Sequence, residues 1–222
     1  MSANERTITV TGRGGIHAQP DVTVISLSLI TLHDTYQDAY EQAKSDTDRL
    51  SAIMSELGLS KQLPKTTSLD IDKKTSSQYD ENDNYIGDKF LGFQLKHVVS
   101  IKIGIDNVLL NKIVKAVGAA LKQAEINIGY MVKDARPLQL KIIERAVKDA
   151  KEKAEIMAAA VGCVLGDCIS INYSVQELHI FTQARSIHGP EEAVCCNEAS
   201  LDITPEDLDV SDTVTVVWAL KC

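Results

Sequence analysis

Hydrophobic residues occupy every second position from Phe93 to Ile105 except for His97, and this period of two limits the possible folds more than any other feature. Successive side chains of a β-strand point to opposite faces of a sheet, so the run predicts a strand with one buried face. A polar stretch from Gln78 to Asn84 precedes it, and a shorter apolar pattern lies before that stretch. The sequence therefore predicts a long antiparallel hairpin from about Thr66 to Ile105.

Three segments instead show the period of an amphipathic helix: residues 35–58, 106–121 and 134–161. In the first, Thr35 is the expected N-cap and Gly58 the left-handed stop. The inner stripe of the third segment is rich in small side chains, which allow a helix to lie close to a sheet. That stripe consists of Ile142, Ile143, Ala146, Ala150, Ala154, Met157, Ala158 and Val161.

Further strands are predicted near residues 7–10, 22–32, 126–132, 168–175 and 213–220. In the second of these the apolar phase changes after Val24, which indicates either burial on both faces or a bulge. The cluster Gly12-Arg13-Gly14-Gly15 predicts a turn between the first two strands. Hairpin connections of this kind favour an α+β fold, a mainly antiparallel sheet packed against long amphipathic helices. We expect a single domain over residues 6–221, with residues 176–212 forming a polar, acidic loop or insertion before the last strand.

Composition excludes several classes of protein. The chain has 23 Lys and Arg against 31 Asp and Glu, a net charge of −8, which argues against a nucleic-acid partner. No apolar run reaches the roughly 20 residues of a transmembrane helix. The first residues lack the features of a signal peptide, so we expect a cytoplasmic protein, with the periplasm or cell envelope as the alternative if a leader was removed.

The five cysteines are an odd number, as expected for free thiols in a reducing compartment. Cys163 and Cys168 flank the start of a predicted strand, where cysteine usually behaves as a small hydrophobic residue. Cys195 and Cys196 lie in the polar stretch near His188. They are the thiols that a thiol- or metal-dependent enzyme would use.

Other candidate motifs fail at decisive positions. The glycine cluster lacks the Lys-Ser/Thr of a phosphate-binding loop and is followed by a strand. Asp80, Asn82 and Asn84 have the spacing of a calcium loop, but Tyr85 replaces its glycine and Leu91 its final carboxylate.

The histidines also lack a catalytic context, because no Ser or Cys stands in a nucleophile elbow that would give His17, His33 or His97 a role. His97 is read as a satisfied core residue. We therefore predict no catalytic, cofactor-binding or metal-binding residues and no cofactor.

Separated blocks of the sequence resemble the SIMPL family, a domain of unknown function. They are residues 8–14 with Gln19-Pro20-Asp21, residues 146–169, and Ile203-Thr204-Pro205 with the closing Val214-Thr215-Val216. The resemblance implies a SIMPL-like α+β fold and a bacterial protein. One bacterial relative is an immunogenic envelope protein that forms a large ring- or channel-like homo-oligomer. Others are linked to oxidative-stress tolerance, and the animal namesake is a signalling adaptor.

The chain departs from this family in two respects. Many members carry a secretion signal, whose features the first residues of this sequence lack. In addition, Glu206 stands where the family often has Gly. The expected function is accordingly a non-enzymatic, self-associating protein, a homo-oligomer related to stress. Two alternatives remain open: the thiol or metal enzyme using Cys195 and Cys196, and a protein that binds a small ligand between sheet and helices.

Overall fold

The computed structural model describes residues 6–121, 123–173, 181–183 and 203–221. The chain divides into two compact units that interleave along the sequence. The first unit combines residues 1–20, 132–181 and 205–222, and the second combines residues 21–131 and 182–204. The single domain expected over residues 6–221 stays a prediction.

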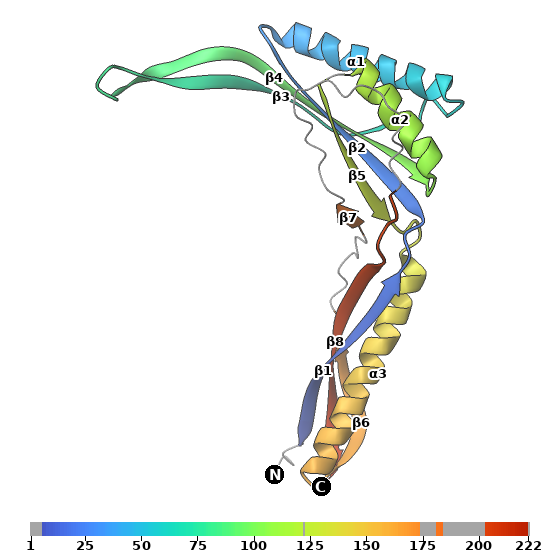
Figure 1. The fold of residues 1–222 in the computed structure, drawn as a ribbon. Helices are drawn as coiled ribbons and strands as arrows, with labels where there is room; N and C mark the ends of the chain where they lie inside the picture. Colours follow the sequence, from blue (N-terminus) through green and yellow to red (C-terminus); the bar gives the residue numbers. More distant parts are fainter. Residues whose placement is uncertain (1–5, 122, 174–180, 184–202, 222) are drawn as a thin grey trace. The chain divides into compact units, whose positions relative to one another are not determined.

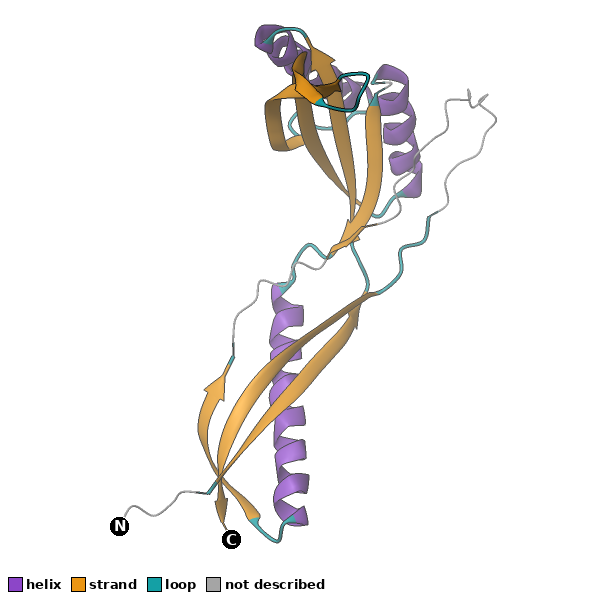
Figure 2. Cartoon of the chain, turned by 90° about the vertical axis from the view of Figure 1, so that its left-hand side faces the viewer, coloured by secondary structure: helices purple, strands orange, loops and turns teal. Residues whose placement is uncertain are grey.

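The first unit is a three-stranded sheet with one helix on it (Figures 1 and 2). Its strand order is β1 (Thr7–Ala18), β8 (Leu208–Lys221) and β6 (Val164–Asn172), and both pairings are antiparallel. Helix α3 (Arg136–Ala160) covers one face. The core between them contains Val10, Ala146, Ala150, Ala154, Val214, Val216 and Trp218.

The alanine stripe of α3 is buried, as predicted, at Ala146, Ala150, Ala154 and Ala158. The outer limits of that stripe were wrong, because Met157 and Val161 are exposed.

The predicted turn at Gly12 to Gly15 is also wrong, because these residues lie inside the continuous strand β1. A Cβ at Gly12 would overlap the carbonyl oxygen of Ala146, and one at Gly14 would overlap that of Ile142. The two glycines therefore let α3 approach the sheet.

The second unit is a five-stranded sheet in the order β3-β4-β2-β5-β7. The strands are β2 (Val22–His33), β3 (Lys65–Tyr79), β4 (Tyr85–Gly104), β5 (Ala124–Met131) and the short β7 (Phe181–Gln183). Helices α1 (Tyr36–Glu56) and α2 (Asn107–Ala120) pack on it (Figure 1). The two antiparallel sheets and three helices of the described residues confirm the α+β class.

Strand β2 shows why the apolar phase changed in the sequence. Thr23, Val24 and Ile25 are all buried, although successive residues face opposite sides of the sheet. The β2 register runs without a shift against β4 and β5. Burial on both faces, and not a bulge, is therefore the correct alternative.

The predicted hairpin is present and extends beyond the rest of its sheet (Figure 1). Strand β4 pairs with β2 only as far as Phe93, so residues 85–92 of β4 pair with residues 74–79 of β3 alone. We call these residues and the connecting tip the hairpin extension, residues 74–92. It begins at a register shift after Lys74, opposite the positive-φ residue Gly92.

The loop expected over residues 176–212 is in part wrong. Strand β7 lies within that range, and β8 already begins at Leu208. Residues 176–180 and 184–202 of the expected loop lie outside the described part of the chain.

Candidate functional site

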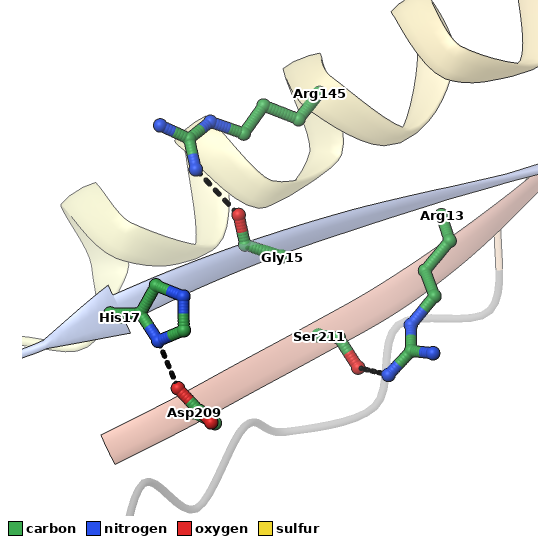
Figure 3. Close-up of polar contacts among 6 residues, drawn as sticks. All are labelled: Arg13, Gly15, His17, Arg145, Asp209 and Ser211. Atoms are coloured by element: carbon green, nitrogen blue, oxygen red, sulfur yellow. Dashed lines mark hydrogen bonds and ion pairs between the residues drawn. The ribbon is translucent and has the colours of Figure 1, made fainter. Parts of the chain in front are cut away.

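Strand β1 forms one edge of the first unit's sheet, and α3 covers part of that edge. The backbone N–H of Arg13 donates to Oδ2 of Asp149 at 2.7 Å. The guanidinium of Arg145 donates to the carbonyl oxygen of Gly15 (Figure 3). Asp149 and Arg145 stand four residues apart on one helix face. Two backbone groups that would otherwise be open to another strand are thus satisfied by side chains of α3.

Asp149 is held in place from a second side. The Nζ of Lys153, four residues later on the helix, donates to the same Oδ2 at 2.7 Å. The Lys153 ammonium and the Arg13 amide hold the pKa of the Asp149 carboxyl below its ordinary value. The carboxylate therefore stays ionised as an acceptor for the strand edge.

The sheet face opposite α3 carries a polar row built from β1 and β8. His17 pairs with Asp209 directly across the two strands, and Nη2 of Arg13 donates to Oγ of Ser211 at 2.9 Å (Figure 3). With residues of α3 they line a shallow depression of about 430 Å³. Among the described residues no hydrogen bond joins Ser211 to His17, so the three side chains do not form a serine–histidine–carboxylate relay.

Two titratable side chains of the second unit, Asp46 of α1 and His97 of β4, are buried where α1 packs on the sheet. Asp46 is 3% exposed and His97 is 2% exposed. His97 Nε2 is hydrogen-bonded to the Thr66 hydroxyl at 3.0 Å, but its Nδ1 has no partner among the described residues. The prediction of a core histidine is therefore right about burial and wrong about full satisfaction.

Asp46 faces a cleft between α1, β2 and the end of α2. Its Oδ1 accepts a hydrogen bond from Gln42 at 2.8 Å. The cleft has a volume of about 460 Å³, and its polar lining includes Thr31, His33 and Arg49. Sequence reasoning missed Asp46 because the helical stripe was traced through its apolar neighbours.

Burial shifts the pKa values of Asp46 and His97 in opposite directions. Desolvation raises the pKa of Asp46 despite the Gln42 hydrogen bond and the attraction of Arg49, His97 and His33. Desolvation lowers the pKa of His97, and attraction to Asp46 opposes that shift. The folded state therefore disfavours both the carboxylate and the imidazolium.

The His97 shift predicts a pH-dependent stability. Its folded pKa lies below the unfolded value, about 6.5, so below that pH the unfolded chain binds a proton that the folded chain does not. The free energy of unfolding of the wild type, relative to that of His97→Gln, is expected to fall as pH decreases from about 7.5 to 5.5. Urea denaturation at each pH measures this difference, in which other titrating groups largely cancel. A difference that does not change with pH contradicts the prediction.

The remaining candidates from the sequence do not meet in one site. Asp80 accepts hydrogen bonds from the backbone amides of Asn82 and Asn84 at 2.8 and 2.9 Å, so its carboxylate is used within the hairpin tip. Cys168 is an exposed free thiol, whereas Cys163 is disulfide-bonded, so the expectation of free thiols is wrong for Cys163.

The residues of the enzyme alternative, His188, Cys195 and Cys196, lie outside the described residues. Within the described ranges, no three His, Cys, Asp or Glu side chains gather as a metal-binding group. No helix there is long and apolar enough to span a membrane.

No curated protein matches the chain. The family model SIMPL, a protein of unknown function (DUF541), matches residues 8–218, which include strands of both units. Because the match covers nearly the whole chain, the protein belongs to the SIMPL family.

Proposed function

We propose that the chain is a non-enzymatic protein that self-associates through its hairpin extension. The observation that carries this proposal is the exposure of large hydrophobic side chains on residues 74–92, where only two strands pair. They are Tyr79, Tyr85, Ile86, Phe90 and Leu91, which are 39–62% exposed. A concentration of exposed apolar side chains of this kind is typical of an interaction surface.

The geometry of the hairpin extension also supports a partner. A two-stranded ribbon is marginally stable in water unless something packs on it. Edge-to-face contacts order the exposed rings: Tyr79 packs against Tyr85, and Phe90 packs against the partly buried Phe93, with centroids 6.0 and 5.4 Å apart. The net charge of −8 makes a protein surface a better partner than a nucleic acid.

Light scattering coupled to size-exclusion chromatography tests this proposal. We expect the wild type to exceed the 24.2 kDa of one chain at micromolar concentration, and Ile86→Lys to shift the mass toward the monomer. A lysine here places a charge that an apolar interface would have to desolvate. Ile156→Lys is the matched control, because Ile156 on α3 is 71% exposed and Ile86 is 62% exposed. A monomeric wild type, or equal effects of both substitutions, contradicts the proposal.

A small-ligand function is supported by the cleft at Asp46. A buried carboxylate beside Arg49 and His33, over an apolar floor at Leu29 and Leu121, suits a compound that donates a hydrogen bond to Asp46 and lays an apolar part on the leucines. A compound that co-purifies with the wild type and is lost from Asp46→Asn would favour this function.

The place of the protein in the cell is also a proposal. The disulfide at Cys163 supports the periplasm or cell envelope over the cytoplasm, because disulfides persist in oxidising compartments. A role in oxidative-stress tolerance is proposed on the family resemblance alone.

A further inference from the structure

Along the free edge of β1, one half is hydrogen-bonded to side chains of α3, and we call it the sealed half. The other half has no such bonds, and we call it the open half. Residues of one parity bond to β8, so the N–H and C=O groups of Thr7, Thr9, Thr11, Arg13 and Gly15 face away from it. The hydrogen bonds from α3 seal this edge at Arg13 and Gly15. In the described part of the chain, the outward backbone groups of the three threonines have no partner.

The open half also lacks the features by which proteins usually protect a sheet edge. Natural edges carry charges, prolines or bulges that prevent pairing with another strand. Residues 7–11 read Thr-Ile-Thr-Val-Thr, and the β1–β8 register is unbroken. On the face away from α3, the cross-strand neighbours of the threonines are the uncharged Thr215, Val217 and Ala219. On that face a second strand can therefore approach without meeting a charged side chain.

We propose that residues 7–11 of β1 are a docking surface for a second copy of this chain, which pairs antiparallel through the same residues. Pairing centred on Thr9 sets Thr7 of each copy opposite Thr11 of the other, so every outward N–H meets an outward C=O. The two sheets become one continuous six-stranded sheet. The threonines are placed symmetrically about Thr9, so the segment is complementary to itself in antiparallel pairing, and this favours a second copy over a foreign peptide.

The seal at Arg13 and Gly15 limits the length of this contact. Beyond Thr11 the Arg13 N–H is already bonded to Asp149 and the Gly15 carbonyl oxygen to Arg145, so a second strand cannot form the full ladder of hydrogen bonds there. The contact is short, and we expect a dimer that dissociates on dilution. This inference rests on the proposed self-association but uses a different surface, in the first unit and not the hairpin extension.

Proline at position 9 is the discriminating substitution. The Thr9 N–H does not bond to β8, so Thr9→Pro removes no hydrogen bond of the sheet but deletes the central donor of the contact. Thr9→Val keeps the N–H and is the matched control. We expect Thr9→Pro to raise the dimer dissociation constant, measured by sedimentation, about tenfold or more, and Thr9→Val to change it less than about threefold. A folded Thr9→Pro with an unchanged constant overturns the proposal.

Measurements in the Ile86→Lys background separate this proposal from the one for the hairpin. Loss of association with Ile86→Lys alone supports the hairpin surface, and a further loss on adding Thr9→Pro supports the β1 edge. If Ile86→Lys has no effect and Thr9→Pro does, the hairpin proposal fails and the edge proposal stands.

Amide hydrogen exchange of the wild type gives an independent measurement if Thr9→Pro unfolds. The Thr9 and Thr11 amides should be protected in concentrated protein and exchange rapidly on dilution, while Val10, bonded to β8, stays protected in both. Rapid exchange of Thr9 and Thr11 at concentrations where the protein is associated overturns the proposal. The proposal is also overturned if the Thr9 and Thr11 amides are protected in a protein that sediments as a monomer bound to a foreign peptide.

Discussion

Replacing Gly14 by alanine is expected to lower the free energy of unfolding by about 3 kcal/mol or more, the upper end of the usual cost of overpacking. The added Cβ would overlap the backbone carbonyl oxygen of Ile142. A backbone atom cannot rotate away as a side chain can, so α3 must move off the sheet and leave its alanine stripe loosely packed.

Gly15→Ala is the matched control for this substitution. The nearest atom to a Cβ at Gly15 is the Val210 carbonyl oxygen at 3.7 Å, an ordinary contact. We expect Gly15→Ala to be neutral or to stabilise by up to about 1 kcal/mol, because alanine restricts the unfolded chain. Urea denaturation of both variants measures the difference. Similar losses at the two positions would mean that β1 and α3 do not approach as closely as described.

Leu50→Ala is expected to cost about 2–5 kcal/mol, the range for removing a fully buried leucine side chain. Leu50 is 1% exposed in the core beneath α1, beside Met54 and Leu110. The cavity would form between α1 and the sheet, where the surrounding side chains already fill the space.

Tyr40→Ala tests which face of α1 is buried. The helical period assigns Tyr40 and Leu50 to one stripe, but Tyr40 is 52% exposed. We therefore expect Tyr40→Ala to change the free energy of unfolding by about 0.5 kcal/mol or less. If thermal and urea denaturation show Tyr40→Ala to be as damaging as Leu50→Ala, the helix is rotated relative to this description.

The elements that the sequence predicted well are those with one long, regular period. The alternation through Ile101 and the alanine stripe through Ala150 each report a single buried face, which is why β4 and α3 lie where they were expected. Gly12 and Gly14 were misread because a glycine required for close helix approach looks the same in a sequence as one required for a turn.

Strand partners were beyond the reach of periodicity. Consecutive strands usually pair, so β1 was joined to β2. In the structure β1 pairs with β8, from the other end of the chain. The sealing of the β1 edge was hidden for the same reason, since Asp149 looks like half of a helical ion pair until the strand beneath it is known.

The separation of β1 from β8 along the chain sets an order of events during synthesis on the ribosome. Ala18 pairs with Leu208, about 190 residues later, so the first unit cannot close its sheet until the last strand has emerged. At about 5–20 residues per second, β1 waits roughly 10–40 s, while β2 to β5 and their helices are already complete. During this time the threonine-rich segment of β1 is unpaired and accessible to other nascent chains on the same messenger RNA. It pairs within its own chain only when β8 has emerged.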